Sequence, residues 1–159
     1  GVKKAIICTA ILLGILCACS AQQTPPDVNR VSARSKDVPP DLIIQWIDGD
    51  ETKETTATMS TYSWHYRGGG VEADAPHPLE MTDIATVTDS PAKIKLVFDD
   101  DPLGYTVHRW AEDAGFEDYD TVATGDDTIV LSDDAKCYVY EVIVEYKNGI
   151  VHYAFQICK

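Results

Sequence analysis

Four histidines are the side chains best suited to acid–base or metal chemistry in this sequence: His65, His77, His108 and His152. None of them stands in a metal-ligand spacing such as H-x-x-x-H or H-E-x-x-H. A zinc site would require the fold to gather them from separate elements, so the spacing predicts no metal and no cofactor. His77 lies between two prolines, where a hydrogen bond that fixes the loop is the more common role for an imidazole.

Nucleophilic catalysis has no clear signature in the chain. No G-x-S-x-G elbow occurs, and Ser63, two positions before His65, has no evident third group to orient the imidazole. A pairing of His77 with Asp74 is the remaining route to hydrolysis, because the two residues are close in sequence. We therefore expect a protein that is not an enzyme, with a cell-envelope hydrolase using His77 and Asp74 as the alternative.

Acidic clusters are the other residues that could do chemistry, because calcium takes several oxygen ligands. Asp48, Asp50 and Glu51 are the nearest to such a site, although their spacing does not fit an EF-hand loop. The remaining clusters fall in predicted turns, where carboxylates cap backbone amides and keep strand edges soluble. Only Asp48, Asp50 and Glu51 are retained as minor calcium candidates.

Aromatic residues supply the candidate binding surface. A folded domain of this size needs large inward side chains, so most of the tryptophans are expected in the core. Trp64, however, lies just before a run of three glycines and could line a groove for a sugar or a peptide. Trp64, His77 and Trp110 form the predicted ligand-binding set.

The N-terminal cysteines predict covalent attachment of lipid. Leu16 stands at −3 and Ala18 at −1 relative to Cys19, after an uncharged apolar run over residues 5–18. This arrangement resembles the cleavage box of bacterial lipoproteins, in which the cysteine receives a diacylglyceryl thioether. As a helix of about 1.5 Å rise per residue, the run would be roughly 20 Å long, whereas the hydrocarbon core is roughly 30 Å thick. We therefore do not expect it to be a transmembrane anchor.

A lipid on Cys19 would anchor the protein to the membrane, since two or three acyl chains hold stably where one does not. The expected location is the extracellular face of a bacterial cell membrane. An ordinary signal peptide cut near Ala18 or Ala21, with Cys19 incidental, is the alternative.

The two cysteines of the C-terminal part predict a disulfide. Alternation over residues 137–144 and 151–158 indicates two neighbouring strands, and placing Val144 opposite Val151 puts Cys137 opposite Cys158. A two-residue turn centred on Asn148-Gly149 would shift this register by two and separate the cysteines. The turn signal and the cysteine signal disagree, and an exported domain favours the disulfide.

Charge and composition limit the number of domains and the kinds of partner that the chain can have. Residues 1–18 contain two lysines and no acid, so their removal changes the formal net charge from −13 to −15. Such acidity argues against nucleic-acid binding. Residues 1–18 are the predicted lipoprotein signal peptide, residues 19–40 the lipidated cysteine and a flexible proline-containing tether, and residues 41–159 one folded domain.

Short alternating segments separated by Gly, Pro and Asp turns position all of these residues. Seven to nine strands and no long helical period predict an all-β fold, an antiparallel immunoglobulin-like β-sandwich. A small β-barrel has the same local signals and is the alternative.

Two patches carry a family resemblance. Residues 61–64 (TYSW) with 73–79 (ADAPHPL), and residues 138–142 with 153–155, resemble small lipoproteins of Gram-positive Firmicutes. The module is also similar to extracellular tails of some membrane-bound sensor peptidases. The resemblance implies the sandwich fold and the surface location, and no catalytic residue.

The expected function is a surface-tethered binding or sensory module. Its partners would be the membrane, through the lipid, and a cell-wall or protein ligand. A structural envelope protein without any ligand is a further alternative.

Overall fold

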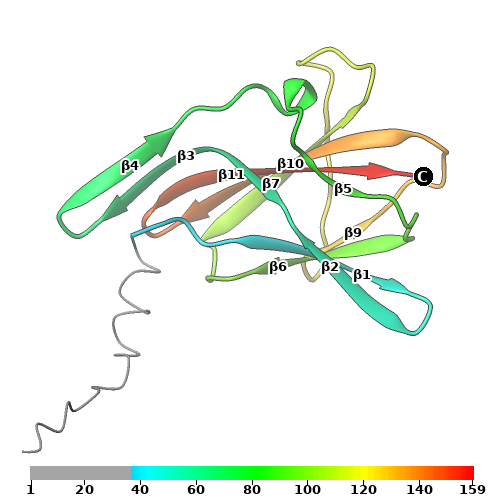
Figure 1. The fold of residues 1–159 in the computed structure, drawn as a ribbon, viewed down its shortest axis with the longest axis horizontal. Coiled ribbons are helices and arrows are strands. Elements are labelled where there is room, and N and C mark those ends of the chain that lie inside the picture. The colour runs from blue at the N-terminus through cyan, green and yellow to red at the C-terminus, as the bar shows by residue number, and fades with distance from the viewer. Residues whose placement is uncertain (1–36) are drawn as a thin grey trace, which may run out of the picture.

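Two β-sheets pack face to face in the computed structural model, which describes residues 37–159 (Figure 1). The smaller sheet has the order β2-β1-β6-β9. Its strands are β1 (Leu42–Asp48), β2 (Glu51–Thr56), β6 (Lys93–Phe98) and β9 (Thr128–Val130). All neighbours in this sheet are antiparallel.

The larger sheet has the order β4-β3-β11-β10-β7-β8. Its strands are β3 (Thr58–Tyr66), β4 (Gly69–Ala73), β7 (Gly104–Ala111), β8 (Asp120–Thr121), β10 (Cys137–Tyr146) and β11 (Gly149–Cys158). A short strand, β5 (Ala85–Val87), pairs in parallel with the end of β11. The predicted all-β sandwich is confirmed, and the barrel alternative is wrong, because two separate sheets face each other.

The threonine-rich stretch after β1 joins the two sheets. Ala57, which is buried, separates β2 of the smaller sheet from β3 of the larger one. Its amide donates a hydrogen bond to the carbonyl of Leu42 at 2.9 Å, so the crossing point is tied to the start of β1. The only helical element among residues 37–159 is a short 3-10 turn, η1 (Pro78–Glu80), and no helix of this part is long and apolar enough to cross a membrane.

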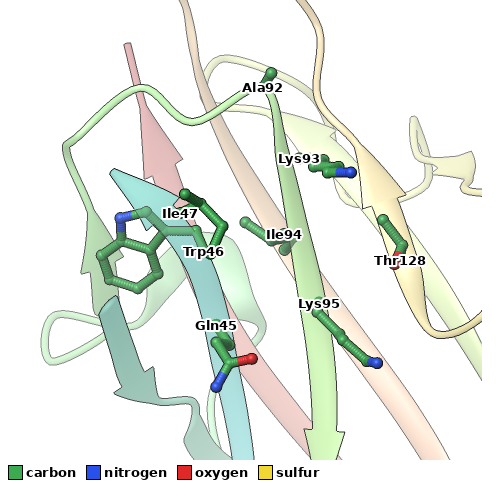
Figure 2. A pocket seen from close by; sticks show the side chains of 8 residues that line it. All are labelled: Gln45, Trp46, Ile47, Ala92, Lys93, Ile94, Lys95 and Thr128. Atoms are coloured by element: carbon green, nitrogen blue, oxygen red, sulfur yellow. The ribbon is translucent and has the colours of Figure 1, made fainter. Parts of the chain in front are cut away.

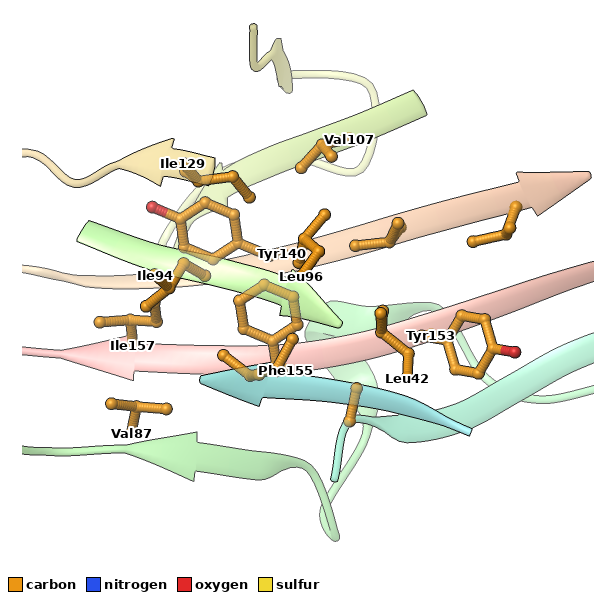
Figure 3. Packing of buried hydrophobic residues seen from close by; sticks show 14 of the residues in the cluster. Leu42, Val87, Ile94, Leu96, Val107, Ile129, Tyr140, Tyr153, Phe155 and Ile157 are labelled. Atoms are coloured by element: carbon orange, nitrogen blue, oxygen red, sulfur yellow. The ribbon is translucent and has the colours of Figure 1, made fainter. Parts of the chain in front are cut away.

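The core lies between the sheets and follows the alternation of the strands. Tyr140 of β10 and Phe155 of β11 are fully buried and their rings stack with centroids 5.1 Å apart. Leu42, Ile94 and Leu96 of the smaller sheet face them (Figure 3). Burial of this apolar area, at roughly 25 cal/mol per Å², is the main force that holds the sandwich together.

The final hairpin has the register that the cysteines predict. Val144 lies opposite Val151, Cys137 lies opposite Cys158, and the two cysteines form a disulfide with Cα atoms 4.1 Å apart. The turn residues are Lys147 and Asn148, because Tyr146 pairs with Gly149. The competing prediction of a turn centred on Asn148-Gly149 is therefore wrong.

Gly149 is needed both for its backbone conformation and for packing. It pairs with Trp64 of β3, with φ at +152°, and a Cβ atom here would collide with the carbonyl oxygen of Ser63. The close approach of β3 to the hairpin thus explains the glycine. The predicted signal peptide, the predicted lipidation site Cys19 and residues 19–36 of the predicted tether lie outside the described residues.

Candidate functional site

The outer face of the larger sheet gathers side chains from β7, β10 and two connecting segments. Successive strand residues point to opposite faces, and Val107 of β7 is buried in the core between the sheets. His108 and Trp110, one and three positions further along β7, therefore point to the outer face, and their rings contact residues outside the core cluster. This outer face is where the sequence-predicted His77 and Trp110 meet.

Five rings form what we call the ring cluster: His77, His108, Trp110, Phe116 and Tyr119. The imidazole of His77 stacks on Phe116 with centroids 4.1 Å apart and meets Trp110 edge-on at 5.0 Å. The imidazole of His108 stacks on Tyr119 at 4.1 Å. Trp110 also contacts Tyr119 at 5.5 Å, so the indole joins both stacked pairs.

Trp110 anchors the cluster while two rings face solvent. The indole is 3% exposed, and its Nε1 donates a hydrogen bond to the carbonyl of Phe116 at 2.8 Å. Phe116 and Tyr119 are 47% and 41% exposed. A buried side chain therefore holds a segment that presents two aromatic rings at the surface.

His77 serves as a cap for η1. Its Nδ1 accepts a hydrogen bond from the amide of Leu79 at 3.2 Å, and Pro78 follows at the first position of the turn. Within residues 37–159, His77 forms no hydrogen bond or ion pair with Asp74. The pairing that the hydrolase alternative requires is not present in this geometry, and the expected loop-fixing hydrogen bond is.

A carboxylate lies between two imidazoles beside the ring cluster. Glu141 of β10, with its side chain 13% exposed, is 3.0 Å from Nδ1 of His152 and 4.0 Å from Nδ1 of His108. The three residues come from three adjacent strands, β7, β10 and β11. The described part of the chain nevertheless contains no group of three His, Cys, Asp or Glu residues placed to hold a metal ion.

A hydrogen-bond group on β3 and β4 contains Ser63, His65 and Glu72. Its hydrogen bonds are not connected as those of a catalytic triad are. The hydroxyl of Ser63 is 3.4 Å from Nε2 of His65 and donates to Glu72 at 3.3 Å. In a triad the acid orients the imidazole, whereas here the acid bonds to the serine. The arrangement is a surface hydrogen-bond group on two neighbouring strands.

Trp64 does not join His77 and Trp110. It is 3% exposed within the core and meets Tyr146 edge-on at 5.8 Å. The prediction that these three residues share a binding surface is corrected for Trp64, because the strand alternation points it inward. Two of the three predicted residues, His77 and Trp110, come together.

The calcium candidates are not arranged as a ligand set. The carboxylate of Asp48 is 2.5 Å from Nζ of Lys53, which also contacts Asp89 at 3.1 Å. Hydrogen bonds with Asp48 and then Asp89 raise the pKa of Lys53. Lys53, followed by the indole N–H of Trp46, lowers the pKa of Asp89. Asp48 is therefore paired with a lysine, and no group of three acidic, histidine or cysteine side chains within residues 37–159 is placed to hold a cation.

Sequence reasoning missed Phe116, Tyr119 and Glu141. A usable signal existed for each: Phe116 and Tyr119 are apolar rings within an acidic turn, and Glu141 interrupts an apolar strand. Neither signal predicts which residues the side chains of Phe116, Tyr119 and Glu141 contact. Their partners come from strands and loops that only the fold brings together.

A scan of the sequence against protein-family models found no matching family, and searches among curated proteins and solved structures found no match.

Proposed function

We propose that this chain is a lipid-anchored binding protein, without enzymatic activity, that recognises its partner through the ring cluster. One observation carries the proposal: Phe116 and Tyr119 are both half-exposed, and each is stacked on an imidazole. Rings held in place before binding lose little conformational entropy when a partner arrives. Aromatic residues of this kind dominate the energy of protein interfaces.

The charge around the rings favours a basic partner. Glu117 and Asp118 lie between Phe116 and Tyr119 in sequence and are exposed. A Lys or Arg side chain placed over an aromatic ring gains a cation–π interaction, and flanking carboxylates add attraction. We propose a basic segment of another exported protein as the ligand.

A pull-down tests the proposed binding surface. The purified protein is incubated with secreted proteins in one arm and with cell-wall fragments in the other, and bound material is identified. The variant Phe116→Ala/Tyr119→Ala should lose the specific partner. Leu103→Ala, which removes an exposed apolar side chain elsewhere, should retain it. Retention of the same partner by both variants would exclude the ring cluster, and wall fragments as sole ligand would exclude the basic protein.

The proposed location rests on the lipoprotein cleavage box and on the resemblance to Firmicutes lipoproteins. The Cys137–Cys158 disulfide supports export, because such bonds persist in oxidising compartments. Metabolic labelling with an alkyne fatty acid in a bacterial host should mark the protein, and Cys19→Ala should abolish the label. Cys17→Ala is the matched control and should keep it. A label that survives Cys19→Ala would contradict lipidation at this residue.

A further inference from the structure

The smaller sheet contains a hollow at the point where β1 and β6 stop pairing. Their register runs from Leu42↔Phe98 to Gln45↔Lys95 and ends there, although both strands continue. The hollow has a volume of about 350 Å³, at the lower end of the roughly 300–1,000 Å³ found for ligand sites. It lies on the opposite sheet from the ring cluster and does not depend on the proposed function.

The lining combines backbone, charge and apolar surface (Figure 2). Ile47 and Ile94 lie between the two strands in this view, with Lys93 and Lys95 along β6. The full lining is Gln45, Trp46, Ile47, Ala92, Lys93, Ile94, Lys95 and Thr128.

The hydrogen-bond alternation shows what is missing in the hollow. The amide of Asp99 donates to the carbonyl of Asp41 at 3.2 Å, which identifies a hydrogen-bonded pair in the antiparallel ladder. Every second pair is of this kind, so Ile47 and Lys93 would form the next one after Gln45 and Lys95. That pair is not formed. The main-chain N–H and C=O groups of both residues are thus directed at the hollow.

The charge at the hollow is opposite to that of the protein. Lys93 and Lys95 lie two positions apart on β6, so they share the outer face of the sheet, and both are exposed. Within residues 37–159 neither lysine forms an ion pair with a carboxylate. Two lysines without acidic partners, in a chain of formal net charge −13, mark a local site for negative charge.

We propose that this hollow binds a short, extended, acidic peptide segment, which enters as a strand between β1 and β6. A peptide backbone supplies both the donors and the acceptors that Ile47 and Lys93 lack across the gap. Acidic side chains of the peptide pair with Lys93 and Lys95. The charge complementarity therefore selects an acidic segment over a basic one.

The pleat of the sheet also predicts the sequence pattern of the ligand. Side chains of an added strand alternate between the outer face, where the lysines lie, and the inner face. Trp46 and Ile94 are buried on the inner face. The preferred ligand is thus acidic and apolar at alternate positions.

Fluorescence anisotropy with a labelled Glu-Val-Glu-Val-Glu peptide tests the proposal on the whole protein. We expect saturable binding, and about tenfold weaker binding by Lys93→Glu/Lys95→Glu, as two partly exposed ion pairs imply. Lys136→Glu/Lys147→Glu changes the net charge by the same amount at exposed lysines away from the hollow and should bind normally. Absence of binding, or equal weakening in both variants, would overturn the proposal.

Two further peptides separate the backbone contribution without altering the protein. A peptide with N-methylated valines cannot donate the main-chain hydrogen bonds and should bind at least about tenfold more weakly. A Glu-Glu-Val-Val-Glu peptide keeps the charge and loses the alternation, so it should also bind more weakly. Equal binding of the N-methylated peptide would show that the peptide does not enter as a strand, and would refute the inference.

Discussion

Aromatic rings serve two different purposes in two regions of this molecule. Between the sheets, Tyr140, Tyr153 and Phe155 come from the central strands β10 and β11 and are fully buried. On the outer face, Phe116 and Tyr119 come from a connecting segment and remain half-exposed. Residue type is thus a poor guide to role, since the same rings either stabilise the sheets or are presented to solvent. Truncating rings in each region and measuring the loss of stability tests this difference.

Phe155→Ala should give the largest loss of stability. The ring is fully buried and stacks on Tyr140, so its removal leaves a cavity between the sheets. Truncation of a buried phenylalanine typically costs about 3–5 kcal/mol in the free energy of unfolding. Chemical denaturation with an unchanged m-value would measure it. A cost below about 1 kcal/mol would mean that these rings do not hold the sheets together.

Tyr153→Phe should have a smaller effect at neutral pH and a distinct one at alkaline pH. The buried hydroxyl donates a hydrogen bond to the carbonyl of Pro40 at 2.5 Å, and loss of such a bond costs about 1–2 kcal/mol. Burial, with Tyr146 nearby, raises the pKa of Tyr153 far above its ordinary value of 10.0. The unfolded chain therefore loses this proton first as the pH rises.

The sign of the alkaline effect follows from that raised pKa. Stability from a neutral buried phenol is fully present below about pH 10 and declines as the pH rises further. Thermal melts between pH 8 and pH 11.5 should show a shallower decline for Tyr153→Phe than for the original protein. The decline persists in part, because burial also raises the pKa of Tyr140 and Tyr146. Identical slopes would contradict the assignment.

Trp110→Phe tests how the exposed rings of the outer face are held in place. The substitution keeps an aromatic ring on the outer face and removes the hydrogen bond from Nε1 to the carbonyl of Phe116. We expect a loss of about 1–2 kcal/mol in the free energy of unfolding, from the bond and the smaller ring. Proteolysis should become faster within residues 112–119. Unchanged proteolysis would show that the indole does not hold this segment.

The interior was predictable from sequence because it depends on a local rule. Alternation along β10 and β11 placed Tyr140 and Phe155 on one face, and the cysteines then set the register of the hairpin. The turn signal failed there because Gly149 lies one position after the two turn residues, where it approaches Ser63 of β3 closely. A glycine at this position is favoured both by the local turn preference and by the packing of β3 against the hairpin.

The outer face was only partly predictable because its contacts join segments far apart in the chain. His77 and Trp110 were identified as candidates, yet their contact at 5.0 Å requires η1 to lie against β10, the neighbour of β7 in the sheet. Trp64 was assigned to the same surface because a glycine turn follows it, and the strand alternation carries it into the core. Alternation says which residues share a face, but not which loop covers that face.

Phe116→Ala/Tyr119→Ala should have the smallest effect on stability and the sharpest effect on binding. Each ring stacks on one imidazole and remains about half-exposed, although Tyr119 also contacts Trp110. The pair should therefore contribute less than about 1 kcal/mol to the free energy of unfolding. Rings kept for stability would be buried, as Phe155 is. Denaturation of this variant beside Phe155→Ala measures both regions in one experiment. Equal losses would make the outer rings a second core, and loss of the partner with stability retained would establish a surface kept for recognition.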